Sequence, residues 1–107
     1  MQQGITQERM EAGLEFLAES DERFAVAKTD VLRAEILCKR VRARVFLVAH
    51  GSVEARRAEA EGHQEVIAAD EDLCEATLAF ETLKAKRARA EIVIDVFRTL
   101  EASRRKA

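Results

Sequence analysis

The 107-residue chain has no proline, tryptophan or tyrosine, and it has only four glycines. Four scattered glycines exclude a glycine-rich loop that would hold a phosphate group. Charged residues make up 36% of the chain and hydrophobic residues 48%, and alanine is frequent. This composition is typical of long helices or coiled coils rather than of a sheet protein or a disordered tail.

No hydrophobic run approaches the roughly 20 residues that a membrane-spanning helix needs. The first residues, Met1 to Ile5, lack the basic and then apolar segments of a signal peptide. We therefore expect no membrane contact and a cytoplasmic protein. The length fits one domain, residues 1–107, in which two helices alone would enclose little core.

Two apolar columns with seven-residue spacing mirror each other about Gly51 and Ser52. The first column contains Met10, Leu17, Phe24, Val31, Cys38 and Val45. The second contains Val66, Leu73, Phe80 and Ile94, with Arg87 in place of an apolar residue. If the chain folds back at Gly51, residues whose numbers sum to about 104 face each other, such as Cys38 and Val66. The pattern predicts an all-α fold, a long antiparallel two-helix hairpin of the coiled-coil type.

The predicted helices cover about 6–49 and about 53–102, with a turn at 50–52 and a short basic tail. Thr6 and Ser52 are candidate N-caps, and Gly51 is typical of a residue just past a helix end. A rival topology has a short helix 6–18 followed by two long helices, with Ser20 as a cap. We favour the continuous helix because the seven-residue spacing of the apolar residues continues across Ser20 without interruption.

A second column of mostly small residues predicts close approach of the two helices, for example of Val41 to Gly62. The charges favour the same antiparallel register, because residues 58–83 carry eight acidic side chains and no lysine or arginine and would lie beside the basic stretch 39–44. The expected ion pairs are Arg89 with Glu15, Arg23 with Glu81, Arg33 with Glu71, and Lys39 with Glu65.

Apolar residues outside the columns predict assembly into a homo-oligomeric helical bundle or ring, because residues 92–100 are apolar almost all round. The expected interface contains Phe16, Ile92, Val93, Val96, Phe97 and Leu100. The alternative is that a short N-terminal segment folds back over these residues.

Cys38 and Cys74 are offset by about eight residues in the hairpin, or ~12 Å. We therefore expect buried free thiols, and a bridge between subunits is the alternative.

Catalytic chemistry finds little support in the sequence. His50, His63 and the two cysteines lack the short paired spacings of a zinc site, and no nucleophile has a neighbouring base. Residues 70–72 are consecutive carboxylates, which point in different directions from a helix. We expect no enzyme activity, no metal and no cofactor.

Clusters of basic residues are the feature with the most functional promise, because a phosphate backbone attracts them. The net charge of −2 and the absence of stacking tyrosine and tryptophan argue against a dedicated nucleic-acid protein. The basic residues expected to lack acidic partners, and so to bind nucleic acid, are Arg42, Arg56, Arg57, Arg104, Arg105 and Lys106.

Residues 28–105 resemble small helical proteins of tailed bacteriophages and prophages. The similarity lies in residues 39–47 (KRVRARVFL), 51–56 (GSVEAR) and 92–105 (IVIDVFRTLEASRR). The resemblance implies a recombination mediator, an oligomeric accessory in the bacterial host cytoplasm. Such a protein helps a recombinase or annealing protein load onto single-stranded DNA, and it contacts the DNA, a single-strand-binding protein or both.

The sequence thus predicts a non-enzymatic DNA-recombination or replication accessory that scaffolds single-stranded DNA, a recombinase or a single-strand-binding protein. The alternative is a structural or assembly adaptor or chaperone that binds a partner helix and no nucleic acid. A third class, a small regulator such as a toxin partner, would be a monomer or dimer.

Overall fold

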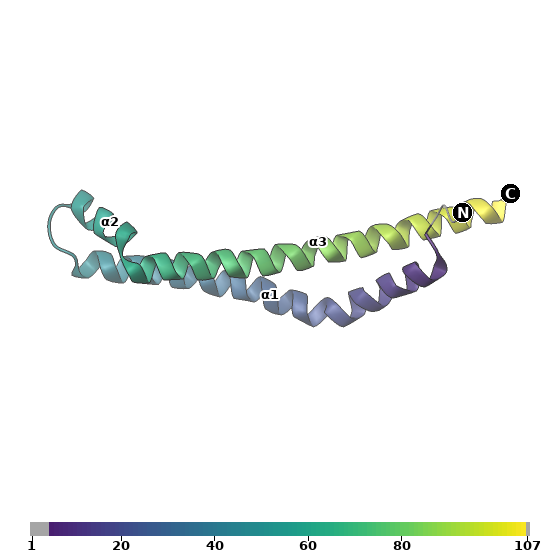
Figure 1. Ribbon diagram of the computed structural model, residues 1–107, viewed down its shortest axis with the longest axis horizontal. Coiled ribbons are helices and arrows are strands. Elements are labelled where there is room, and N and C mark those ends of the chain that lie inside the picture. Colours follow the sequence, from purple (N-terminus) through teal and green to yellow (C-terminus); the bar gives the residue numbers. More distant parts are fainter. Residues whose placement is uncertain (1–4, 107) are drawn as a thin grey trace. The chain divides into compact units, whose positions relative to one another are not determined.

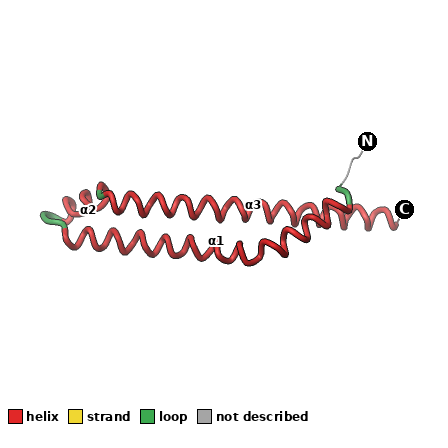
Figure 2. The backbone as a smooth tube through the Cα atoms, turned by 60° about the horizontal axis from the view of Figure 1, so that its bottom comes forward, coloured by secondary structure: helices red, strands yellow, loops and turns green. Residues whose placement is uncertain are grey.

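The computed structural model describes residues 5–106, which form three helices and no strand (Figure 1). α1 spans Gln7–Val48, α2 spans Val53–Gly62 and α3 spans Gln64–Lys106. Loops within this range are confined to the helix ends and the connections before and after α2 (Figure 2). The all-α class predicted from the sequence is confirmed, and a helical hairpin is compatible with this order of elements.

Hydroxyl side chains begin the first two helices. Thr6 Oγ1 accepts a hydrogen bond from the Arg9 backbone N–H at 3.1 Å, and Ser52 Oγ accepts one from the Ala55 N–H at 3.1 Å. Gly51 has a φ of +105°, a left-handed conformation that L side chains rarely adopt. The turn after α1 therefore requires glycine at this position.

The second predicted helix, 53–102, is wrong in one respect, because it is broken at His63. This residue is extended, with φ −74° and ψ 136°, and its N–H bonds the carbonyl of Ala60 at 3.2 Å. Its Nδ1 accepts a hydrogen bond from the Glu65 N–H at 3.1 Å, so the imidazole acts as a cap for α3. Gly62 lowers the cost of ending α2 here, because glycine is a poor helix former.

The break also removes the predicted approach of Val41 to Gly62. Gly62 is exposed, and apart from the adjoining chain no atom lies within 4 Å of the place where a Cβ would be. Ala60 packs near Val41 in place of Gly62. Val41 and Ala60 belong to the same buried cluster.

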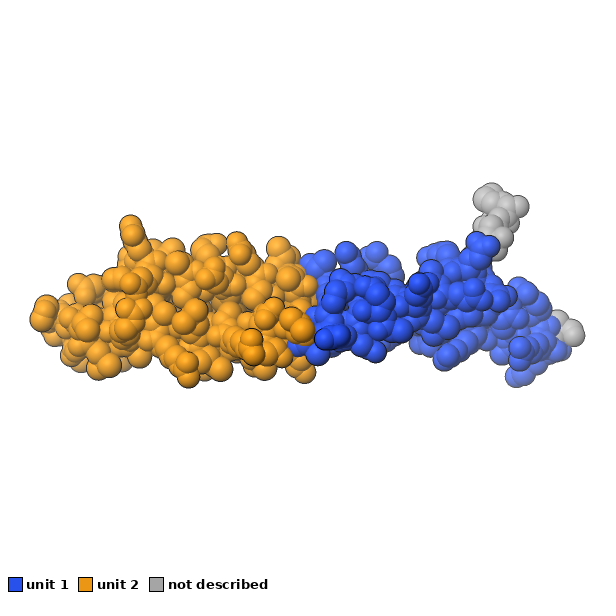
Figure 3. All heavy atoms as spheres, turned by 90° about the horizontal axis from the view of Figure 1, so that it is seen from below, with its two compact units in different colours: residues 1–25, 81–107 blue, residues 26–80 orange. Residues whose placement is uncertain are grey.

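The chain divides into two compact units (Figure 3). Unit 1 contains residues 1–25 and 81–107, and unit 2 contains residues 26–80. Each unit thus pairs a part of α1 with a part of α3, and unit 2 also includes α2 and the turn before it.

The core of unit 2 follows the two predicted columns. Its buried cluster consists of Cys38, Val41, Val45, Ala60, Val66 and Ala69, with Leu73 packed against it. Cys38, Val45, Val66 and Leu73 belong to the two apolar columns, and Val41 and Ala69 belong to the second column of mostly small residues. These positions are buried because every seventh residue of each helix lies at the seam between the two helices.

Unit 1 has an unusually small core. Gly13, Ser20, Ala90 and Ile94 are its buried residues within 5–25 and 81–106. A Cβ added at Gly13 would lie 3.4 Å from the carbonyl oxygen of Ala90 and 3.5 Å from Ile94 Cγ1. Small residues at facing positions therefore let the two backbones approach each other, as the second column predicts.

α1 runs without interruption through Ser20, so the rival topology with a short helix 6–18 is wrong. The Ser20 side chain is fully buried, and its hydroxyl accepts a hydrogen bond from Arg87 Nη1 at 2.6 Å. Arg87 Nη1 also donates to the Leu17 carbonyl at 2.9 Å. Ser20 thus serves a contact across the seam rather than a helix start.

Candidate binding surfaces

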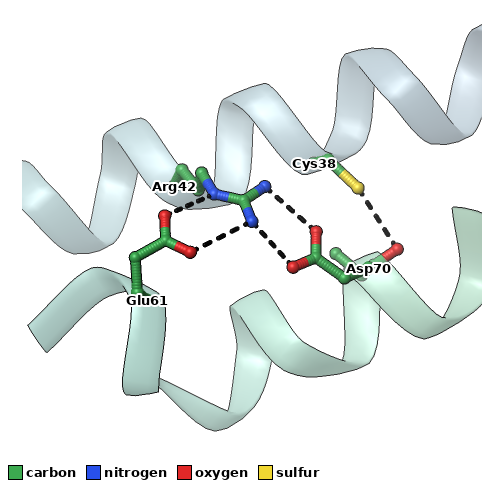
Figure 4. A network of polar contacts seen from close by, with 5 residues as sticks. Cys38, Arg42, Glu61 and Asp70 are labelled. Carbon is green, nitrogen blue, oxygen red and sulfur yellow. Dashed lines mark hydrogen bonds and ion pairs between the residues drawn. The ribbon is translucent and has the colours of Figure 1, made fainter. Parts of the chain in front are cut away.

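Arg42 is the centre of a polar network in unit 2 (Figure 4). Its Nε donates to Glu61 Oε1 at 2.9 Å, and its two terminal nitrogens donate to the carboxylate of Asp70 at 2.7 and 3.0 Å. A planar guanidinium suits such paired contacts with a carboxylate. The arginine therefore links α1 to both α2 and α3.

This network alters the ionisation of its members. Hydrogen bonds from Arg42 lower the pKa of Asp70 below its ordinary value. The carboxylates of Glu61 and Asp70 in turn raise the pKa of Arg42 further above its ordinary range. The prediction that Arg42 lacks an acidic partner is wrong, because Arg42 forms ion pairs with both Glu61 of α2 and Asp70 of α3. Its charge is neutralised within the fold.

The two cysteines are free, as expected, but only Cys38 is buried. Its Sγ donates a hydrogen bond to the carbonyl of Ala69 at 3.2 Å, and burial raises the pKa of the thiol. Cys74 is exposed, so the expectation of two buried thiols is wrong for this residue. Position 74 lies one residue beyond the buried column position Leu73 and faces away from the seam.

Arg56 closes the end of α1 rather than facing solvent. Its Nε donates to the Phe46 carbonyl at 3.2 Å and its Nη2 to the Leu47 carbonyl at 3.4 Å. The guanidinium also lies over the Phe46 ring, 4.7 Å from its centroid. A cation at a helix C-terminus satisfies free carbonyls and the helix dipole. The neighbouring Arg57 is exposed.

The three basic residues of the last α3 turn are exposed. Arg104 forms an ion pair with Glu101 at 3.1 Å within the same helix. Arg105 and Lys106 form no ion pair within residues 5–106. Of the six predicted nucleic-acid-binding residues, Arg57, Arg105 and Lys106 therefore keep exposed charges that the described chain does not pair.

None of the four predicted ion pairs is formed among the residues that the structure describes. Arg23 instead contacts Glu19 of its own helix, at 2.9 Å, and Glu65 pairs with Arg44. Charged residues that flank a coiled-coil seam reach diagonally across it, so partners need not share the register of the apolar columns. The block of acidic residues nevertheless neutralises basic ones from 39–44, as the charge pattern indicated.

The predicted oligomer interface separates into two groups. Ile92, Val96 and Leu100 are 61%, 40% and 43% exposed and recur every four residues along α3. We call these three residues the apolar stripe, because residues at this spacing share a helix face. The other members, Phe16, Val93 and Phe97, are half-buried within unit 1.

A groove of about 410 Å³ lies in unit 1. It is lined by Arg9, Ala12, Gly13, Phe16, Lys86, Arg89, Ala90 and Val93. Gly13 and Ala90 lie where the two helices approach each other closely, and Phe16 and Val93 line the groove together with them. The sequence predicted Phe16 and Val93 as contact residues but not Arg9, Lys86 or Arg89, and it paired Arg89 with Glu15.

A second groove, of about 450 Å³, lies in unit 2. Its lining residues are Arg42, Ala43, Phe46, Leu47, Arg57, Ala60 and Glu61. Here Glu61 pairs with Arg42, so opposite charges already meet inside the lining. The unit 1 groove differs, because its lining has three basic residues and no acidic one.

Within residues 5–106, no three histidine, cysteine, aspartate or glutamate side chains gather closely enough to hold a metal ion. None of the described helices contains a stretch that is long and apolar enough to cross a lipid bilayer.

Comparison of the chain with models of protein families, with curated proteins and with solved structures finds no match. The resemblance to phage recombination mediators stays a prediction.

Proposed function

We propose that this protein is a non-enzymatic helical scaffold that assembles with copies of itself through exposed apolar faces. The number of exposed compared with buried aliphatic side chains supports the proposal. Among the described residues, thirteen leucine, isoleucine and valine side chains are exposed. Only four such side chains, Val41, Val45, Val66 and Ile94, are buried. A chain that leaves most of its large aliphatic residues in water gains by covering them against another helix.

The single observation that carries the proposal is the apolar stripe of Ile92, Val96 and Leu100. A row of exposed aliphatic residues at four-residue spacing is the usual contact of one helix with another. Covering the three side chains would contribute on the order of 1.5–3 kcal/mol for each residue that becomes fully buried. This is large compared with the contribution of an exposed ion pair.

The test replaces Ile92 and Val96 together with glutamate and measures molecular mass by light scattering after size exclusion. Both side chains are exposed in the chain itself, so the variant should keep its helicity by circular dichroism while its mass falls. The control is Ala102→Glu, which adds a negative charge to another face of the same helix. Unchanged mass in the double variant would contradict assembly through the stripe.

A second candidate function is the nucleic-acid accessory that the sequence predicted. The observation that favours it is the exposed charge of Arg57, Arg105 and Lys106, which form no ion pair within the described residues. Phosphate binding by such residues weakens steeply as salt rises, whereas apolar helix packing changes little. Binding of a single-stranded oligonucleotide at low and moderate salt, to wild type and to Arg105→Ala with Lys106→Ala, tests this function. Equal binding by both proteins would exclude the α3 end as the contact.

A further inference from the structure

The unit 1 groove combines an apolar floor with a basic rim. Its rim residues Arg9, Lys86 and Arg89 are all exposed. None of the three forms an ion pair within residues 5–106. The groove therefore offers its charges to a partner, whereas Arg42 in the unit 2 groove is neutralised by Glu61 and Asp70.

Such a lining selects an amphipathic helix with acidic flanks. Phe16, Ala12 and Val93 present apolar surface, which a phosphate backbone does not need. Basic side chains beside that surface meet carboxylates on the flanks of a docked helix, and this complementarity sets its position.

The chain itself contains a helix face with these properties. On α3, Ile67 and Leu78 are 49% and 69% exposed, and Cys74 is exposed between them. Glu71 and Glu75 share this side of the helix, because spacings of four, seven, eight and eleven residues from position 67 return to one face. We call these five residues the acidic face. Neither glutamate forms an ion pair within the described residues.

We propose that the unit 1 groove of one copy receives the acidic face of α3 from a second copy. The inference rests on the proposed self-assembly and names a contact beyond the apolar stripe. The N-terminal part of α1 is a poorer occupant, because it carries Arg9 and Arg23 among its acids and only Leu14 as a large exposed apolar residue. Residues 58–83 carry eight acidic residues and no lysine or arginine.

Contact between two different surfaces has a structural consequence. Each copy would use its groove toward one neighbour and its acidic face toward another, so the assembly grows head to tail until it closes. Charge reversal on one surface should block growth, and reversal on both surfaces should restore it with the signs exchanged.

The experiment uses three variants of the full chain. One carries Lys86→Glu and Arg89→Glu, one carries Glu71→Lys and Glu75→Lys, and one carries all four changes. Association is followed by light-scattering mass over a concentration series, and circular dichroism checks helicity. The matched control, Arg98→Glu with Arg105→Glu, reverses two basic residues on the same helix outside the groove.

Each double variant should need a concentration higher by about tenfold or more for the same degree of association, because like charges then meet. The four-residue variant should associate as wild type does, and an equimolar mixture of the two double variants should recover association. In wild type, association should slow the labelling of Cys74 by a thiol reagent, since this residue lies on the acidic face.

Wild-type association in both double variants would overturn the inference while leaving the proposed scaffold intact, since the stripe alone would then explain assembly. Weakened association that the four-residue variant does not recover, at unchanged helicity, would show that the groove binds something other than the acidic face. A wild-type chain that stays monomeric at every concentration would overturn both the inference and the proposed function. If the protein binds an oligonucleotide in a salt-sensitive way, and only the Lys86→Glu with Arg89→Glu variant loses this binding, the groove binds nucleic acid. That result would also overturn the inference.

Discussion

The guanidinium of Arg87 donates a 2.6 Å hydrogen bond to the fully buried hydroxyl of Ser20. The same side chain bonds the Leu17 carbonyl and Asp21, and it lies over the Phe24 ring with its carbon 5.0 Å from the centroid. Arg87 occupies a column position where an apolar residue would be expected. A polar contact at one point of a helical seam fixes register, because any shift leaves both groups without partners.

Removing this contact should reveal strong coupling between the two residues. We expect Ser20→Ala and Arg87→Met, made singly and together, to give a coupling free energy of about 1.5–3 kcal/mol, as for other hydrogen bonds to charged groups. Urea unfolding of the four proteins measures it. Additivity of the two single effects to within about 0.5 kcal/mol would mean that the bond contributes little in solution.

Gly13 provides a test of close packing in unit 1. Its added Cβ would make ordinary contacts with Ala90 and Ile94, so Gly13→Ala should stabilise by about 0.5–1 kcal/mol through helix propensity. Gly13→Leu should destabilise by about 1–3 kcal/mol because the larger side chain has no space. Thermal unfolding measures both. At Gly62, which has open space, alanine and leucine should differ far less; a similar difference at the two sites would contradict the packing at Gly13.

The two thiols should differ in reactivity. In dilute protein, Cys74 should react quickly with a thiol reagent, and Cys38 should react slowly because it is buried and its pKa is raised by burial. Stopped-flow absorbance should therefore give two phases of equal amplitude. Cys74→Ser should retain only the slow phase, and a fast phase in that variant would show that Cys38 is accessible.

Asp70 should make stability depend on pH. Arg42 lowers the pKa of Asp70 below its ordinary value of 3.8, so the folded state favours the ionised carboxylate. The resulting stability is present above the unfolded-state pKa and is lost as pH falls through the lower folded-state pKa. Asp70→Asn should therefore be less stable than wild type at neutral pH, and the difference should shrink in acid.

The measurement is the free energy of unfolding of both proteins across this pH range. Asp72→Asn serves as the control, because Asp72 is exposed and forms no ion pair within residues 5–106. Its difference from wild type should stay nearly flat. Equal pH profiles for Asp70→Asn and wild type would contradict the role of the Arg42 pair.

The sequence predicts the helices and the buried columns well because their signal repeats many times. Every seventh residue along α1 and α3 samples the same seam, so errors at single positions average out. Arg87 could be located from its place in a column, although not its bond to Ser20. The register of Gly13 against Ala90 also follows from the columns.

Features that occur once in the chain, such as the helix break and the individual ion pairs, could not be predicted from the sequence. The break at His63 depends on an imidazole that caps α3, and histidine has no strong preference for this role. The ion pair of Arg42 with Asp70 does not follow from the register of the columns, because these two residues do not face each other in it. Long charged side chains choose among several neighbours at small differences in energy, so the individual ion pairs of residues such as Arg23 and Glu65 do not follow from register.

The central claim is that the chain assembles with itself, and the mass of the wild-type protein tests it most directly. Light scattering or sedimentation equilibrium over a concentration series should give a mass that is a multiple of the 12.0 kDa chain mass and that falls on dilution. The Ile92→Glu and Val96→Glu variant should lie closer to 12.0 kDa under the same conditions. A wild-type mass of 12.0 kDa at every concentration would contradict the account.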